Sequence, residues 1–137
     1  MNEELNEQNK RSYTIKKLAN LYLDPNNYRF IDDKDYKFIN ENELLTDKIQ
    51  KKTRGFIEGE KRENIKDLIS SFKANGFMDV DVIQVRDLGN NNYLVLEGNR
   101  RVTTLKVLQE DYENGKDIGN LNPEIFKKIH FVIHDNE

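Results

Sequence analysis

Residues 93–108 read YLVLEGNRRVTTLKVL and combine two patterns in one short stretch. The first four residues form an apolar run of strand length, preceded by the turn-forming residues 89–92, GNNN. Beyond Gly98, apolar side chains recur close to one face of a helix, at Val102, Leu105, Leu108 and Tyr112. The stretch therefore predicts a buried strand, a one-glycine turn, and an amphipathic helix with Asn99 as its N-cap.

Two arginines follow this turn directly. Arg100 and Arg101 fall in the first helical turn, where the helix macrodipole already disfavours cations. Unbonded backbone N–H groups, a glycine that permits close approach and two guanidinium groups together describe an anion site, most naturally one for phosphate. The alternative is a surface turn whose arginines pair with nearby carboxylates, such as Glu97. Both interpretations stay open on the residues alone.

The flanking residues predict an α+β fold, a small mixed β-sheet packed with helices. Residues 64–76 follow a helical pattern with Asn64 as cap and Gly76 just past the end, and residues 80–85 are strand-like and close a hairpin onto residues 93–96. A helical turn at 124–128 precedes a strand at Ile129–Ile133. Further upstream, a helix is expected at 41–52, burying Leu44, Leu45 and Ile49, with a loop at 55–60.

Several of these segments resemble the signature boxes of the ParB/sulfiredoxin superfamily. Residues 96–106, LEGNRRVTTLK, are similar to its second box, in which a strand leads into Gly-Glu-Arg-Arg and a helix. Residues 23–30, LDPNNYRF, are similar to the first box, an Asn-Pro-x-Gln-Pro-Arg segment after a short strand. The intervening helix and strand and the final strand follow in the family's order, so the resemblance covers residues 13–135 and implies a ParB/sulfiredoxin-like sheet.

The sequence also departs from the family. Asn99 stands where ParB has glutamate and sulfiredoxins have their catalytic cysteine, and the chain has no cysteine, which excludes sulfiredoxin chemistry. Residues 31–63 are longer than the family's connection, and the later Glu-Asn-x-Gln-Arg motif and the helix-turn-helix domain are not found. We expect a flexible segment at 1–12 and one domain at 13–137, as the front part of a larger protein.

The resemblance implies a nucleotide-binding domain that holds a nucleoside triphosphate with Mg²⁺, with slow hydrolysis as a switch in a DNA-associated system. The implied phosphate-binding residues are Glu97, Gly98, Asn99, Arg100, Arg101 and Thr103, with Asn27 and Arg29 of the first box. No metal site is expected from the protein alone. Two alternatives stay open: a phosphoryl-transfer enzyme or nuclease using the same pocket, and a non-catalytic DNA- or protein-interaction domain.

Asp24 is the candidate catalytic residue, because it lies in the first box beside Arg29. Its carboxylate could orient a magnesium ion or act as a general base for water. The structural alternative is that it caps the turn at Pro25, and the two interpretations carry equal weight.

Basic residues in the 31–63 segment form a second candidate site. Lys48, Lys51, Lys52 and Arg54 describe either a nucleic-acid patch or, as we favour, a solvated helix face. His130 and His134 would lie about 13 Å apart on a strand, too far for one metal ion.

Composition limits the class of protein. The 137 residues carry a net charge of −3, with 34% charged and 36% hydrophobic side chains, which argues against a generic DNA-coating protein. No apolar run approaches the ~20 residues of a membrane helix, and no signal-peptide pattern opens the chain. A cytoplasmic protein with a single core is expected, while its oligomeric state cannot be read from the sequence.

Overall fold

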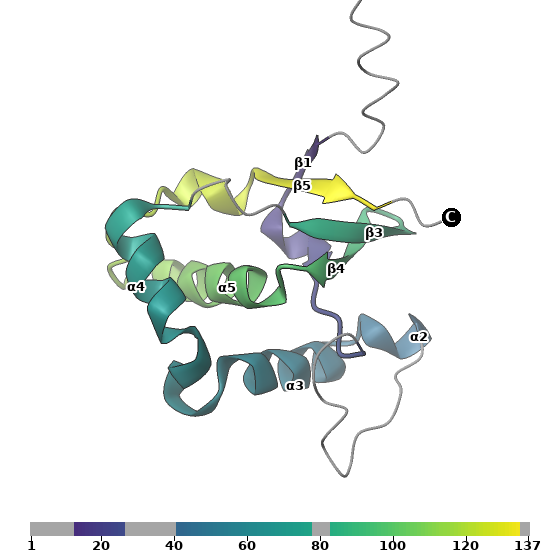
Figure 1. Ribbon diagram of the computed structural model, residues 1–137, viewed down its shortest axis with the longest axis horizontal. Coiled ribbons are helices and arrows are strands. Elements are labelled where there is room, and N and C mark those ends of the chain that lie inside the picture. Colours follow the sequence, from purple (N-terminus) through teal and green to yellow (C-terminus); the bar gives the residue numbers. More distant parts are fainter. Residues whose placement is uncertain (1–12, 27–40, 78–82, 135–137) are drawn as a thin grey trace, which may run out of the picture.

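A mixed five-stranded sheet with helices packed beside it makes up the computed structural model, which describes residues 13–26, 41–77 and 83–134. Figure 1 shows the longer helices gathered on the left and most of the sheet on the right. The predicted α+β class, a small mixed sheet packed with helices, is confirmed.

The sheet is built from strands far apart in the sequence. Its strands are β1 (Tyr13–Lys16), β2 (Leu21–Tyr22), β3 (Gln84–Gly89), β4 (Asn92–Glu97) and β5 (Ile129–Ile133). They lie in the order β1-β5-β3-β4-β2. The β1/β5 and β3/β4 pairs are antiparallel, whereas the β3/β5 and β2/β4 pairs are parallel. The β4 strand therefore has β2 on one side and β3 on the other.

The predicted hairpin between β3 and β4 is confirmed. Asn90 and Asn91 have φ angles of 56° and 63°, so both central residues of the turn are left-handed. This conformation suits two-residue hairpin turns, and asparagine tolerates it better than most residues. Val85 pairs with Val95 across the hairpin. The other residues assigned to this strand, Val80 and Val82, lie outside the described part of the chain.

The described helical elements are η1 (Leu18–Asn20), α2 (Glu41–Leu44), α3 (Asp47–Glu58), η3 (Glu60–Ile65), α4 (Lys66–Asn75), α5 (Asn99–Glu113) and η4 (Pro123–Phe126). The prediction of one helix at 41–52 and a loop at 55–60 was wrong. The chain breaks after α2, and Thr46 restarts the helix by accepting a hydrogen bond from the Ile49 N–H at 3.4 Å. The α3 helix then continues through Gly55 to Glu58. Of the three residues expected to be buried here, Leu44 is buried, while Leu45 and Ile49 are half-buried.

The α4 helix begins one residue later than predicted. Asn64 belongs to the 3₁₀ turn η3, and the N-cap of α4 is Ile65, whose side chain makes no capping hydrogen bond. The predicted end is confirmed, since Gly76 has φ +78° and its N–H bonds to the Phe72 carbonyl at 2.8 Å.

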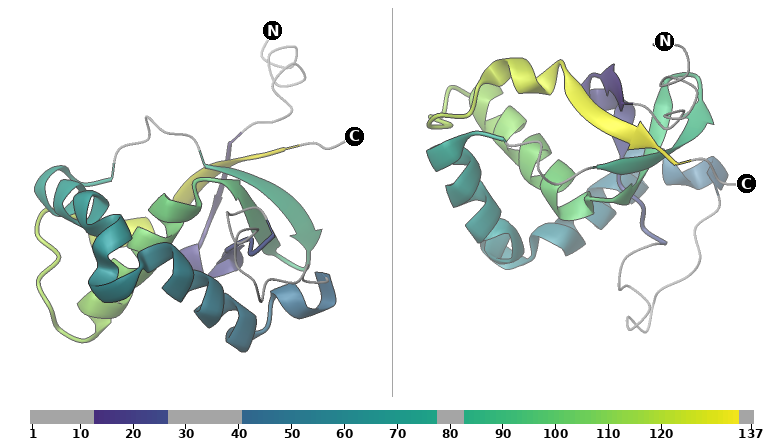
Figure 2. Two further views of the ribbon diagram at one scale, coloured as in Figure 1. Left: turned by 60° about the horizontal axis from the view of Figure 1, so that its bottom comes forward. Right: turned by 45° about the horizontal axis from the view of Figure 1, so that its top comes forward.

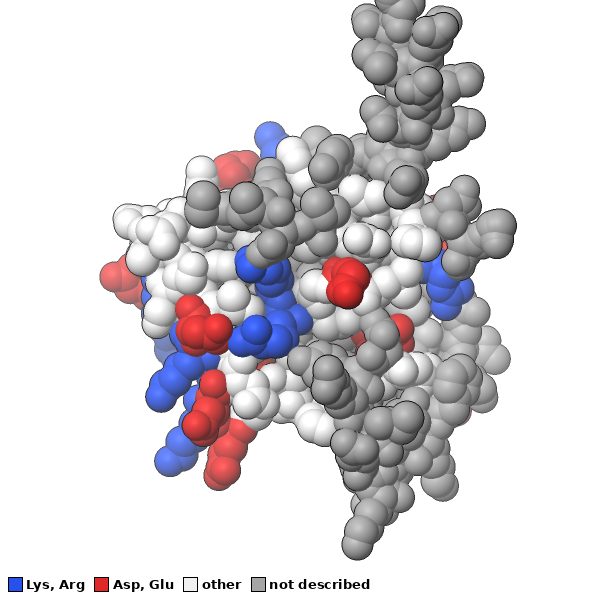
Figure 3. Space-filling view, in the orientation of Figure 1, with Lys and Arg blue, Asp and Glu red and all other residues white. Residues whose placement is uncertain are grey.

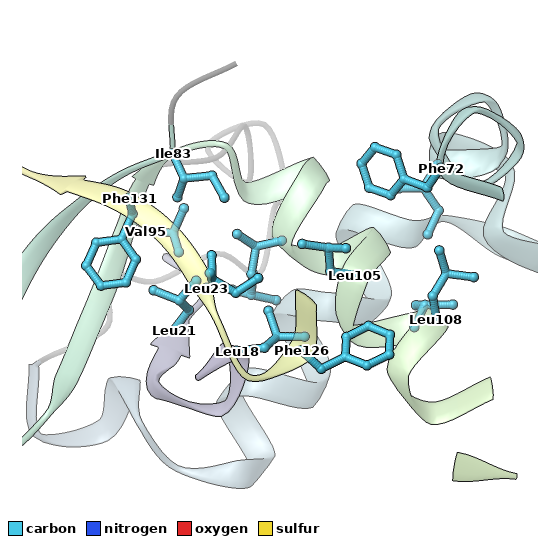
Figure 4. Close-up of a cluster of buried hydrophobic side chains, with 14 of the residues drawn as sticks. Leu18, Leu21, Leu23, Phe72, Ile83, Val95, Leu105, Leu108, Phe126 and Phe131 are labelled. Carbon is cyan, nitrogen blue, oxygen red and sulfur yellow. The ribbon is translucent and has the colours of Figure 1, made fainter. Parts of the chain in front are cut away.

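One apolar core joins the helices to the sheet. Figure 4 shows part of it, with Leu105 and Leu108 from α5 close to Phe126 and Leu18. Tyr112 departs from the predicted apolar face of this helix, because it is 47% exposed. Across the ranges that the structure describes, no helix combines the length and apolarity needed to span a membrane.

The α5 helix is the central helical element. It packs against α3, α4, η1 and η4, and its Leu105 and Leu108 are fully buried. Figures 1 and 2 show α3 and α5 running side by side, with α4 joining them at one end. The β4 strand ends at Glu97 and α5 begins at Asn99. The turn predicted to bind phosphate therefore connects the sheet directly to the central helix.

Candidate functional site

The turn between β4 and α5 is made by one residue. Gly98 has φ +107° and ψ 18°, a left-handed conformation that glycine adopts without steric cost. A Cβ atom at Gly98 would lie 3.3 Å from the Cγ1 atom of Ile83, so the backbone also passes close to the core. The N-cap of α5 is Gly98 rather than Asn99, which corrects the prediction.

Asn99 cannot cap the helix because its side chain joins two other segments. It is 6% exposed, and its Oδ1 atom accepts a hydrogen bond from the Asp24 N–H at 3.1 Å. Its Nδ2 atom donates to the Val95 carbonyl at 3.1 Å. The segment around Asp24 therefore lies against the start of α5, although the two are 75 residues apart in sequence.

The first turn of α5 is electropositive. The earliest helical hydrogen bond runs from the Val102 N–H to the Gly98 carbonyl at 2.9 Å, so the N–H groups of Asn99 and Arg100 have no acceptor within the helix. No acidic residue lies in this turn, and its N-cap, Gly98, has no side chain that could accept a hydrogen bond. Figure 3 shows basic side chains over the region where α5 begins. This is the geometry of an anion site.

Arg100 also ties α5 to the start of α4. Its Nε and Nη2 atoms donate to the Asn64 carbonyl at 3.2 and 2.7 Å, and Nη2 lies 2.9 Å from the Asp67 Oδ1 atom. The guanidinium group of Arg101 lies 6.0 Å from the centre of the Phe72 ring. Pairing with a carboxylate, the alternative to phosphate binding, is therefore present for Arg100, although Asp67 itself is 71% exposed on its side chain.

Asp24 has a structural role in this geometry. The residue is 7% exposed, and its Oδ1 atom accepts the N–H of Asn26 at 2.9 Å, which closes the turn around Pro25. Asn27 and Arg29, the other first-box candidates, lie outside the described residues.

The remaining two candidates from the second box differ in exposure. Glu97 is exposed at the end of β4. Thr103 is fully buried one turn into α5, and its Oγ1 atom has no hydrogen-bond partner within residues 13–26, 41–77 and 83–134. A buried hydroxyl without a partner is uncommon and costs free energy of folding.

Arg54, one of the four residues of the predicted basic patch, is paired with two carboxylates. The Nη1 and Nη2 atoms of Arg54 contact the two carboxylate oxygens of Glu110 at 2.6 and 2.7 Å, and its Nε atom contacts Glu58 at 2.7 Å. The hydrogen bond from Arg54 holds the pKa of Glu110 below its ordinary value. Lys48, Lys51 and Lys52 are exposed, and Figure 3 shows acidic and basic side chains interleaved where α3 leads into η3. These observations favour a solvated helix face.

A cleft between α3 and α5 was not foreseen from the sequence. Its volume is about 350 Å³. It is lined by Ala19, Tyr22, Leu23, Asp47, Gln50, Lys51, Arg54, Lys106, Gln109, Glu110 and Glu113. Lys106 donates to the Leu18 carbonyl at 3.3 Å, and burial lowers its pKa to about 8. The available signal was a lysine inside the apolar run from Leu105 to Leu108.

Within the described ranges, no three histidine or acidic side chains converge to form a metal site. His130 is exposed within β5, and His134 is exposed directly after that strand. No family model, curated protein or solved structure matches the chain. Inference about function therefore depends on the geometry of the α5 turn and of the α3–α5 cleft.

Proposed function

We propose that the protein is a ParB-like nucleotide-binding domain that holds the phosphates of a nucleoside triphosphate at the N-terminus of α5. The observation that carries the proposal is the hydrogen bond between the Asp24 N–H and Asn99 Oδ1. It brings the two segments that resemble the ParB boxes together, although nothing in their sequence spacing requires them to meet.

The donors available at this turn suit a phosphate group. The N–H groups of Asn99 and Arg100 point out of the helix end, and the left-handed Gly98 leaves no side chain in front of them. Arg100 uses Nε and Nη2 for Asn64 and Asp67, so its Nη1 atom supplies further donors for a ligand. Because all these groups carry positive or partial positive charge, bound phosphate would relieve the unfavourable placement of two arginines at a helix start.

Magnesium enters this proposal only with the nucleotide. The described residues bring no three ligands together, and one oxygen of the Asp24 carboxylate is already bonded to the Asn26 N–H. Asp24 therefore positions the loop, and we derive no metal-dependent step and no hydrolysis from this chain.

Thermal unfolding with CTP, ATP, GTP, UTP and their diphosphates, each with and without magnesium, tests the proposal. A ligand at about 100 times its dissociation constant should stabilise the fold by about 2.7 kcal/mol. The Arg100→Ala and Arg101→Ala variants should lose this stabilisation, measured against the same variant without ligand. No stabilisation of the folded protein by any nucleotide, or full stabilisation of both variants, would refute the proposal.

Asp67→Asn provides the matched control. The substitution removes the charge that competes for Arg100 but keeps the shape of the side chain. Because the position is exposed, we expect only a small change in the stability of the fold. Affinity for nucleotide should stay equal or increase. Lys116→Ala, at an exposed position beyond the end of α5, should leave affinity unchanged. A loss of affinity in Asp67→Asn as large as in Arg100→Ala would mean that Arg100 serves the fold alone.

A further inference from the structure

The α3–α5 cleft is a separate site from the start of α5. Lys106 lies seven residues along α5 from Asn99, about 10 Å along the helix axis. The cleft reaches the Lys106 side chain from the side of α3, through Gln50, Lys51 and Arg54. Nothing in the proposed nucleotide site uses this amine.

The described part of the chain offers the Lys106 amine no anionic partner. Among the described residues its one hydrogen bond goes to the Leu18 carbonyl, at a long 3.3 Å, and no carboxylate lies within salt-bridge distance. Glu110, the nearest acidic group on the same helix, is held by Arg54 at 2.6 and 2.7 Å. Burial and the positive charge of Arg54 therefore disfavour the ammonium form, and they lower the Lys106 pKa to about 8.

We propose that Lys106 is a nucleophilic amine and that the α3–α5 cleft admits small aldehydes, which form an imine with it. A cleft of about 350 Å³ has room for a ligand of this class. Lysines with an amine desolvated beside another cation are the type that react with carbonyl compounds.

The reaction balances without a further reactant. The lone pair of the neutral amine forms a bond to the carbonyl carbon, and the carbonyl π electrons move to oxygen, giving a carbinolamine. The two protons of the amine then leave with that oxygen as water, while a second carbon–nitrogen bond forms the imine. Solvent at the open side of the cleft carries the protons between nitrogen and oxygen.

The other titratable groups of the cleft come from three elements. On α3 they are Asp47, Lys51 and Arg54; on α5 they are Glu110 and Glu113; on β2 the group is Tyr22. Arg54 and Glu110 are paired with each other, and Lys51 is exposed. Lys51 is therefore the internal reference, a lysine of the same cleft without the burial of Lys106.

Reductive trapping of the whole chain tests the proposal. The protein is incubated with glyoxylate and cyanoborohydride across a pH series, and the modified lysines are counted by peptide mass spectrometry. With its pKa near 8, Lys106 has roughly 300 times the free-base fraction of an ordinary lysine at pH 7. We expect it to be modified at least about tenfold faster than Lys51, with a half-maximal rate near pH 8. Equal or slower modification of Lys106 would overturn the proposal.

Two variants test whether Lys106 is modified because its amine is reactive or only because the reagent can reach it. Arg54→Gln removes the neighbouring cation and frees Glu110, so it should raise the Lys106 pKa and slow modification at pH 7 several-fold. Lys48→Arg should leave the rate at Lys106 unchanged, because Lys48 is exposed on α3 and is not among the residues that line the cleft. An unchanged rate in Arg54→Gln, in a variant shown to be folded, would count against the proposal.

Discussion

Replacing Thr103 with valine should stabilise the protein. Thr103 is fully buried in α5 and its hydroxyl has no partner among the described residues, so folding removes that hydroxyl from water with no compensating bond in this part of the chain. Such a loss costs about 1–3 kcal/mol. Valine keeps the branched shape and has a similar helix propensity, so the exchange should raise the free energy of unfolding by about 1 kcal/mol and the Tm by about 4 °C.

The neighbouring threonine supplies a matched control. Thr104 is also fully buried, but its Oγ1 atom donates to the Arg100 carbonyl at 2.8 Å. Thr104→Val should therefore lower the free energy of unfolding by about 1 kcal/mol, since it deletes a hydrogen bond that is made. Urea unfolding followed by circular dichroism measures both variants. If Thr103→Val destabilises the protein as much as Thr104→Val does, the Thr103 hydroxyl has a partner, and the reasoning is refuted.

Three further substitutions probe the turn, the ion pair between η3 and α5, and the cleft. Gly98→Ala should lower the free energy of unfolding by about 2 kcal/mol in urea unfolding, because the residue has φ +107° and its Cβ would lie 3.3 Å from Ile83. Arg62→Ala should cost about 2 kcal/mol, because it leaves the 7%-exposed Asp111 without its bidentate partner at 3.1 and 3.2 Å; a cycle with Asp111→Ala isolates the pair. Lys106→Met should stabilise most below pH 8, on the order of 3 kcal/mol, since the unfolded chain binds the Lys106 proton more tightly than the folded one. That gain should shrink as pH rises from about 8 to about 10.5; a gain independent of pH would contradict the lowered pKa.

The elements around the hairpin could be predicted because local patterns and packing agree there. The apolar run of β4, the asparagines at the turn and the α5 periodicity each favour the conformation that is found. The prediction of a single helix at 41–52 was wrong for a physical reason. Gly55 favours a loop by sequence. However, a Cβ built there would meet no described atom within 4 Å beyond its own stretch of helix, and the cost of a glycine in an exposed helix is only about 1 kcal/mol.

Burial of the side chain two residues beyond Gly55 outweighs that cost. Ile57 is 2% exposed, so extending α3 removes a large apolar side chain from water, worth about 1.5–3 kcal/mol. The true end of the helix is Gly59, whose Cβ would lie 2.5 Å from the Nδ2 atom of Asn64. Sequence patterns alone could not rank the two glycines, because the difference lies in tertiary contacts.

The candidate site could likewise be predicted only in part from the sequence. Its backbone features, the glycine turn and the uncapped helix end, follow from residues 98–101. Its side-chain partners do not, because the Asn99–Asp24 and Arg100–Asp67 contacts join segments 75 and 33 residues apart. The cleft was missed for the same reason, since its lining residues come from α3, α5 and the segment at 19–23, which meet only in the folded chain.

The contacts of Arg100 also determine what phosphate binding would do to the fold. The same guanidinium group that faces the α5 turn holds the Asn64 carbonyl and Asp67, at the junction of η3 and α4. Phosphate at this turn would compete with Asp67 for Arg100, because both are anions and the carboxylate is the more exposed partner. Occupancy of the proposed site is thus linked to the attachment of α4, and the linkage is reciprocal: weakening the Asp67 contact strengthens binding, and binding loosens that contact. The Asp67→Asn variant tests both directions, through nucleotide affinity and through amide exchange at the start of α4.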